Sequence, residues 1–373
     1  MDKILTKRQA IILFACLIIS FKVQRLPALL CDDFGRDSYI AIFLFFAIDF
    51  LILMLVLSVY KKLGNDSIFE YIDKNAGRFW LIVFCVLTII FFMFKGLIAY
   101  KQIHEFFANT LFNRLPWKYF GLIFIALLIL MVGNGLKNIG RTVELYIYIM
   151  AFCIIAIIML GTFTADYLRL LPFLDINVDE TAPLLIKYSC WFLDPIILLY
   201  FAGRVKEDKP HIKRGYILTH LICALLVVFG TATFYAVNEY MVGFQSNGLT
   251  ALTEYSLIKL GIGRPDWFLV LFVNIANIIV ASLLLYIVAE SFSKIINKKV
   301  NYFVSAGVMF TVYLWDEFFY RNLEITIMFT TKYANFYMWA FALIIPFVLL
   351  VMPKRSGQNT TQGKSLELAV QHE

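Results

Sequence analysis

Two long apolar stretches of the chain are each interrupted by charged side chains and a proline. In residues 9–30, Lys22, Gln24 and Arg25 precede Pro27, and in residues 183–203, Asp194 stands directly before Pro195. Proline removes a backbone N–H and pushes the residue before it out of the helical conformation. We therefore predict two broken helices, whose free backbone N–H and C=O groups can hold a carboxylate or an amine.

Each interruption also has a second interpretation. Lys22 and Arg25 can lie where a shorter helix leaves the membrane, with side chains that extend to its surface. However, the apolar residues before Lys22 are too few to span a bilayer. Asp194 can mark a simple kink, with its carboxylate held by a buried donor. A charge at the bilayer centre costs about 2.5–3.5 kcal/mol, so charges placed there indicate a functional site.

Polar residues in two other apolar stretches are further candidates. Lys95 lies within residues 79–103. Within residues 266–292, a polar stripe recurs at steps of four residues and has Asn277 beside it; its members are Asn274, Ile278, Ser282 and Tyr286. Such a stripe can line a cavity, or its Asn and Ser side chains can form hydrogen bonds between helices.

The elements that position these residues are predicted to be membrane-spanning helices. The chain is 61% hydrophobic and 16% charged, where a soluble domain carries about 25% charge, and its mean hydropathy is +0.79. A lipid bilayer is therefore the expected solvent. Ten runs have about the required length: 9–30, 38–60, 79–103, 117–134, 142–165, 183–203, 215–238, 266–292, 302–319 and 333–352.

The distribution of basic residues predicts the orientation of these runs. If the N-terminus is cytoplasmic, the loops on that side hold twenty of the 33 Lys and Arg residues, and the opposite loops hold eight. Cytoplasmic loops are richer in Lys and Arg, so both termini are predicted to be cytoplasmic. The net charge of +7 is explained by this topology and indicates no nucleic-acid partner.

The ten runs are predicted to form one transmembrane domain, residues 1–353, followed by a disordered cytoplasmic tail, residues 354–373. The two interrupted runs are the first and the sixth, so each opens a set of five. Broken helices at matching positions of two halves are typical of transporters with inverted repeats and a midplane binding site. The repeats are expected at about 9–165 and 183–352.

Other function classes find little support in the sequence. The six Cys show no CxxC or Cys/His metal spacing, and Walker A and HExxH motifs are absent. A membrane enzyme would need acidic or His side chains clustered near one interface, whereas His104, His211, His220 and His372 are scattered. We therefore predict no catalytic residue, no metal and no cofactor.

A series of short motifs, in order along nearly the whole chain, carries a family resemblance. These motifs are Leu5–Gln9, Leu26–Pro27, Gly35–Asp37, Ser67–Tyr71, Leu115–Trp117, Asn134–Arg141 with Glu144, Leu171–Pro172, Arg264–Trp267 and Leu285–Tyr286. With them, the chain resembles the B-subunit family of spore-germination nutrient receptors, a branch of the amino acid–polyamine–organocation transporter superfamily.

The resemblance implies an all-α, amino acid permease-like fold of five plus five helices, with helices 1 and 6 unwound around a central site. It also implies nutrient sensing in the spore inner membrane, together with an A subunit and a lipoprotein C subunit. One segment departs from the family, which has small, Gly-rich residues at the first break, whereas Phe21–Arg25 is bulky and charged. Lys22 would fill a cation site or pair with Asp194, and either would alter the class of ligand.

We therefore expect a receptor subunit that binds a small nutrient, an amino acid or a similar molecule, between the first, third, sixth and eighth runs. Gln24 and the broken backbone would hold its polar groups, and Asp194 would take an ammonium group or pair with Lys22. The alternative is a proton-coupled amino acid permease that acts alone, with Lys22 or Asp194 titrating. The expected ligand-binding residues are Lys22, Gln24, Lys95, Trp191, Phe192, Asp194, Asn274, Ser282 and Tyr286.

Overall fold

The computed structural model describes residues 4–107, 117–172, 184, 186–205, 209–239, 241, 248, 251–253, 266–320 and 334–353. In these residues the secondary structure is helical, apart from one isolated bridge between Leu5 and Val205. The predicted all-α fold class is confirmed. The predicted tail, 354–373, lies outside the described residues, and so does residue 183, where the second repeat was expected to begin.

Each of the ten predicted runs contains helix in the described part of the chain. The first run holds α1 (Lys7–Val23) and α2 (Leu26–Phe34), and the sixth holds short helical turns that end in α9 (Leu198–Phe201). The other eight are α3 (Ser38–Leu63), α5 (Arg78–Phe106), α6 (Trp117–Gly133), α7 (Leu136–Thr162), α10 (Lys209–Asn238), α12 (Asp266–Ile295), α13 (Tyr302–Tyr320) and α15 (Asn335–Val351). A further short helix, α4 (Ile68–Ala76), connects α3 to α5.

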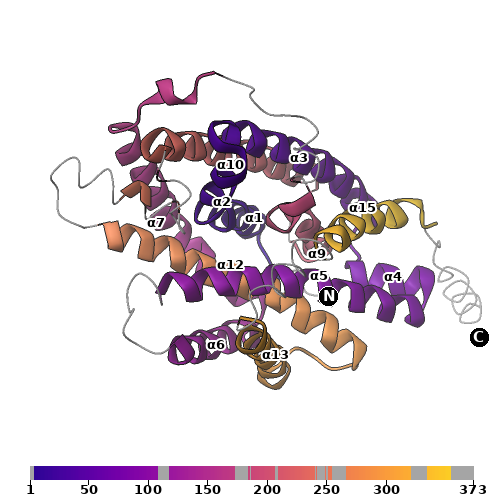
Figure 1. Cartoon of the computed structure of the whole chain (residues 1–373). Coiled ribbons are helices and arrows are strands. Elements are labelled where there is room, and N and C mark those ends of the chain that lie inside the picture. Colours follow the sequence, from indigo (N-terminus) through magenta and orange to yellow (C-terminus); the bar gives the residue numbers. More distant parts are fainter. Residues whose placement is uncertain are drawn as a thin grey trace, which may run out of the picture.

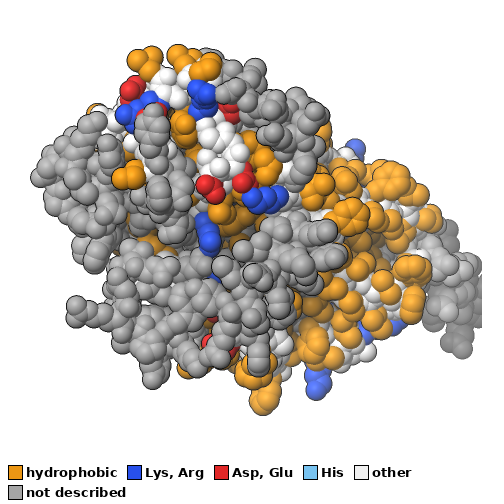
Figure 2. Space-filling model, in the orientation of Figure 1, with side chains coloured by type: hydrophobic (Ala, Val, Ile, Leu, Met, Phe, Trp, Pro, Cys, Tyr) orange, Lys and Arg blue, Asp and Glu red, His pale blue; other side chains and the backbone are white. Residues whose placement is uncertain are grey.

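The helices have the length and surface of a multi-pass membrane protein. In the described residues, five helical segments are long and apolar enough to cross a bilayer: Leu26–Leu63, Arg78–His104, Leu136–Thr162, Ile212–Asn238 and Val270–Ile295. Two shorter apolar helices, Gly121–Gly133 and Asn335–Val351, join them. Hydrophobic side chains cover much of the side of the molecule where α15 lies (Figure 2). Lipid contact explains this surface, which water would not tolerate.

The first run is broken at Gln24 and Arg25, which separate the end of α1 from the start of α2. Pro27 lies in the first turn of α2, where no backbone N–H is needed for the helix. At its other end, α1 begins with a capping box formed by Thr6 and Gln9. One helix therefore begins directly after Thr6, and a second helix begins at the break.

The sixth run is irregular along most of its length. The 3-10 helices η4 (Ser189–Trp191) and η5 (Asp194–Ile197) flank Phe192 and Leu193, and α9 follows directly. Leu193 has a left-handed φ of 66°. This conformation costs roughly 1–2 kcal/mol for a residue other than glycine, so surrounding contacts must hold it in place.

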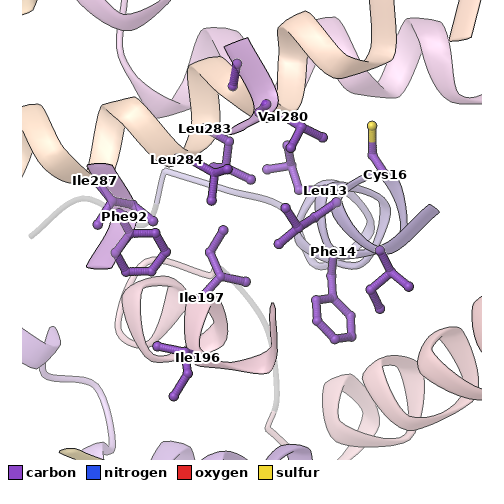
Figure 3. Close-up of a cluster of buried hydrophobic side chains, with 14 of the residues drawn as sticks. Leu13, Phe14, Cys16, Phe92, Ile196, Ile197, Val280, Leu283, Leu284 and Ile287 are labelled. Carbon is purple, nitrogen blue, oxygen red and sulfur yellow. The ribbon is translucent and has the colours of Figure 1, made fainter. Parts of the chain in front are cut away.

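Both breaks lie in the centre of the helix bundle. In Figure 1, α1 and α2 lie between α10 and α3 on one side and α12 and α5 on the other, and α1 packs against α10, α12 and α7. Figure 3 shows the core where α1, α5, η5 and α12 meet, with Leu13, Phe92, Ile197 and Leu284 directed into it. All four are at most 1% exposed. The surrounding helices thus fix the two breaks opposite each other.

Candidate functional site

The carboxylate of Asp194 joins the first, third and sixth runs. Its Oδ1 accepts a hydrogen bond from Lys95 Nζ at 2.6 Å, and its Oδ2 accepts one from Lys22 Nζ. Lys95 Nζ also donates to the Phe192 carbonyl oxygen at 2.5 Å. The three charged side chains are at most 1% exposed. One buried carboxylate therefore holds two ammonium groups at the break of the sixth run.

Two aromatic rings lie beside the Lys22 ammonium group. Its Nζ lies 5.0 Å from the centre of the Phe192 ring and 5.4 Å from that of Phe46. The Phe192 ring stacks on Phe45, with 4.5 Å between ring centres. Within the described residues, Asp194 is the hydrogen-bond partner of this ammonium group. The side chain thus points into the bundle and does not extend to the membrane surface.

Asp49 of α3 is a fourth ionisable residue at this site, and it is not among the residues expected from the sequence. Its Oδ1 accepts the Leu193 N–H at 2.7 Å, and its side chain is buried. Its Oδ2 has no hydrogen-bond partner in the described part of the chain. A signal was present in the sequence, because Asp49 is the one charged residue in the run 38–60.

An amide network joins the break of the first run to α12. Gln24 Nε2 donates to Asn274 Oδ1 at 2.9 Å, and Asn277 Nδ2 donates to Gln24 Oε1. The Gln24 carbonyl oxygen, freed at the break, accepts the Gly248 N–H at 2.7 Å. These are the hydrogen bonds between helices that Asn residues commonly form in membranes. They place Gln24 and Asn274 together.

The structure does not place all of the expected residues at Asp194. Ser282 donates to the Ile278 carbonyl oxygen at 2.8 Å and contacts Met131 Sδ at 3.3 Å. Tyr286 interacts electrostatically with Glu290 and Arg204, which form a separate ion pair. Both residues lie further along α12 than Asn274. Trp191 is buried in η4, next to the break.

The cluster around Asp194 consists of ammonium and carboxyl groups that pair with one another. Within the described residues, no group of three or more His, Cys, Asp or Glu is placed to hold a metal ion. The cluster contains two ammonium groups, the Asp194 carboxylate and the carboxyl group of Asp49. Such an arrangement can exchange its internal ion pairs for pairs with a charged small molecule.

The fold is that of an all-α membrane protein with an amino acid permease-like arrangement of helices. The structure is similar to crystal structures of a manganese transporter from Eremococcus coleocola. For its complex with an aromatic bis-isothiourea compound, the TM-score is 0.55 at 13% identity, covering 97% of this chain and 83% of the transporter. For a mutant of the same transporter, the TM-score is 0.57 at 13% identity. At 13% identity, this similarity shows that the two proteins share a fold and nothing more.

The sequence comparisons identify the family. Residues 4–320 match the family described as "Spore germination protein", and the chain belongs to this family. Spore germination protein XB of Bacillus anthracis is 22% identical over 260 residues, which are 67% of this chain and 72% of the relative. Spore germination protein KB of Bacillus subtilis (strain 168) is 22% identical over 272 residues, 71% of this chain and 72% of the relative. The predicted family resemblance is confirmed.

Proposed function

We propose that the chain is the membrane subunit of a spore germinant receptor and binds a small zwitterionic nutrient, an amino acid or a close analogue, between Lys22 and Asp194. The observation that carries this proposal is the buried Lys22–Asp194 ion pair, which connects the break of the first run to the break of the sixth. The names of the relatives support a role in germination. The charges at the breaks support the class of ligand.

A zwitterion is the kind of ligand that this pair can admit while both Lys22 and Asp194 Oδ2 gain a new partner. If Lys22 is separated from Asp194, its ammonium group loses its partner and Asp194 Oδ2 loses its donor, while Oδ1 keeps Lys95. Removing one partner of a buried pair costs about 3–5 kcal/mol. A bound amino acid supplies a carboxylate to Lys22 and an ammonium group to Asp194. A simple amine leaves the Lys22 ammonium group without a carboxylate, and a simple carboxylic acid leaves Asp194 Oδ2 without a donor.

The first turn of α2 supports the same orientation of the ligand. The positive end of this helix lies at the break, next to Gln24 and Arg25. Helix N-termini stabilise carboxylates through free N–H groups. Lys95 would stay with Asp194 and the Phe192 carbonyl oxygen, and so would preserve the break while Lys22 changes partner.

Binding of this kind would also produce a signal. A ligand shifts a conformational equilibrium only by as much as it prefers one state, and exchange of the Lys22–Asp194 pair would change how the first and sixth runs are held together. As part of the proposal, the chain acts in the spore inner membrane with both termini cytoplasmic, and passes the signal to A and C subunits. Trp191 and Phe192 would wall the site.

The proposal is tested by ligand-dependent stability of the purified full-length chain in detergent. The thermal unfolding midpoint is measured with a panel of amino acids, each matched with its decarboxylated amine and its deaminated acid. A ligand at 100 times its Kd stabilises the folded state by about 2.7 kcal/mol. We expect at least one amino acid to stabilise and its two analogues to have little effect. Equal stabilisation by the amine would contradict the zwitterion site.

A second candidate, a proton-coupled amino acid permease that acts alone, is favoured by the likeness to a transporter fold. The test is uptake of a labelled amino acid by the purified chain in liposomes. Uptake without partner subunits, dependent on a proton gradient, would favour the permease. Binding without uptake, together with co-purification of A and C subunits from spores, would favour the receptor.

A further inference from the structure

Asp49 presents an unusual acceptor beside the break of the sixth run. Its side chain is 1% exposed, and Oδ1 accepts the Leu193 N–H at 2.7 Å. Oδ2 is equally buried and has no hydrogen-bond partner in the described residues. Ionisation of Asp49 in this position carries the desolvation cost of Oδ2, and no hydrogen bond within the described residues offsets that cost. A proton on the carboxyl group removes most of that cost.

Nearby charges also act on the protonation state of Asp49. The Lys22 and Lys95 ammonium groups interact electrostatically with Asp49 and favour its ionised form, while the Asp194 carboxylate opposes it. With Asp49 ionised, the cluster holds two positive and two negative charges. With Asp49 protonated, it carries one net positive charge. Burial and charge balance thus favour different protonation states of the same side chain.

The other elements packed against α3 place few titratable groups near Asp49. On α10, His220 Nε2 lies 3.3 Å from the Phe46 carbonyl oxygen. On α9, the Tyr200 hydroxyl bonds to Thr88 at 2.8 Å. On α15, the Tyr337 hydroxyl bonds to the Leu87 carbonyl oxygen, and residues 335–351 include no charged side chain. The other charged residues of α3, Lys61 and Lys62, stand twelve and thirteen residues after Asp49, about 18 Å or more along the helix at 1.5 Å per residue.

We propose that Asp49 is an exchangeable proton-binding site of this protein, and that its proton controls the conformation of the break at Leu193. Proton uptake forms the O–H bond of a neutral carboxylic acid, and the proton comes from water. This inference goes beyond the proposed function, because it depends on neither a nutrient ligand nor a partner subunit.

The link to the break follows from the Leu193 N–H. Hydrogen bonds to an ionised acceptor are roughly twice as strong as those to a neutral one. The Asp49 carboxylate therefore holds the left-handed conformation of Leu193 more firmly than the protonated form does. Since Asp194, Lys22 and Lys95 meet directly after Leu193, the proton on Asp49 would loosen the segment that positions the ion cluster.

Infrared spectroscopy of the full-length chain in lipid tests the proton site. A buried protonated carboxyl group gives a C=O stretching band that shifts in D₂O. We expect one such band to appear as the pH is lowered from mildly alkaline to mildly acidic. Asp49→Asn should remove it, Asp49→Glu should move it, and the control Asp73→Asn, on the short helix α4, should leave it unchanged. Persistence of the band in Asp49→Asn, or its absence from the unmodified chain at every pH, would overturn the proposal.

Fluorescence of Trp191 tests the link to the break. In a variant that keeps Trp191 and replaces the other five Trp with Phe, the emission should change over the same pH interval as the infrared band. Asn can still accept the Leu193 N–H as a neutral group, so Asp49→Asn should fold and show the low-pH emission at every pH. Emission that still titrates in Asp49→Asn would overturn the link. Neither measurement uses a ligand, so failure here leaves the proposed nutrient site untouched.

Discussion

Two buried ion clusters lie at different depths of the same bundle and differ in how fully they are paired. In the first, Arg204 donates from both terminal nitrogens to the Glu290 carboxylate of α12, at 2.6 and 2.5 Å. In the second, two lysines share Asp194, and Asp49 nearby has one oxygen without a hydrogen-bond partner in the part of the chain that the structure describes. In the first cluster, one guanidinium group pairs with one carboxylate through two hydrogen bonds. In the second, two ammonium groups share one carboxylate, and Asp49 Oδ2 is a further acceptor beside them.

The contacts around the Arg204–Glu290 pair also hold it in place. The Arg204 carbonyl oxygen accepts the N–H groups of Ile4 and Leu5 at 2.9 and 3.1 Å, so the pair ties the N-terminal segment to the end of the sixth run and to α12. The planar guanidinium group matches a carboxylate in a fixed geometry, whereas a lysine ammonium group is a flexible point charge. The Arg204–Glu290 pair is therefore suited to fix a conformation, and the Asp194 cluster is suited to change partners.

The largest effect is expected from Asp194→Asn. This change leaves two buried ammonium groups without a carboxylate, and removing one partner of a buried pair already costs about 3–5 kcal/mol. We expect the free energy of unfolding to fall by at least that amount in denaturant titrations of the purified chain. A loss below about 1 kcal/mol would show that the two lysines do not depend on Asp194.

Arg204→Met should have the next largest effect. It leaves Glu290 buried and alone, so the expected loss is also about 3–5 kcal/mol, but for one stranded charge instead of two. The double variant Arg204→Met, Glu290→Met should recover most of the loss, because well-packed apolar side chains replace a buried pair at little cost. If the double variant is as unstable as the single one, the pair does not act as a matched unit.

Lys95→Met and Lys22→Met distinguish the two lysines within the central cluster. Lys95 bonds to both Asp194 and the Phe192 carbonyl oxygen, while Lys22 bonds to Asp194. Lys95→Met therefore also strands a buried carbonyl oxygen, and we expect it to cost about 1–3 kcal/mol more than Lys22→Met. Equal losses of unfolding free energy would contradict the idea that Lys22 is the lysine free to change partner.

The smallest effect is expected at an exposed pair, Lys74 and Asp66, whose charged atoms are 2.7 Å apart. Surface pairs contribute about 0–1 kcal/mol, so Lys74→Met should leave the free energy of unfolding nearly unchanged. This variant is the matched control for the lysine changes in the core. A loss as large as that of Lys22→Met would mean that burial does not separate the two classes of ion pair.

Much of the fold could be predicted because membrane spans are encoded locally. The runs of apolar residues predicted the helices, and Pro27 and Pro195 marked the two breaks through their own backbone chemistry. Part of the site was also predictable, since Lys22, Lys95 and Asp194 stand out as charges in apolar surroundings. The repeat boundaries and the ligand-binding role of these residues stay predictions.

The remaining features depend on tertiary packing. The stripe on α12 identified one helical face but not the depth of the site, and Asn274 and Tyr286 are twelve residues apart, about 18 Å along the helix. This distance explains why Asn274 meets Gln24 while Tyr286 lies near Arg204. The bond from Leu193 to Asp49 forms because α3 packs against η5, and no local pattern in the sequence indicates that contact.

The most direct test of the zwitterion site is the affinity of the stabilising amino acid for Lys22→Met. Equilibrium binding of the labelled amino acid is measured for the unmodified chain, for Lys22→Met and for the Lys74→Met control. If the ligand carboxylate takes Lys22 as its partner, Lys22→Met should raise Kd by at least about tenfold, which corresponds to ~1.4 kcal/mol. The control should keep the original Kd. A Kd for Lys22→Met that equals that of the control would contradict a ligand bound between Lys22 and Asp194.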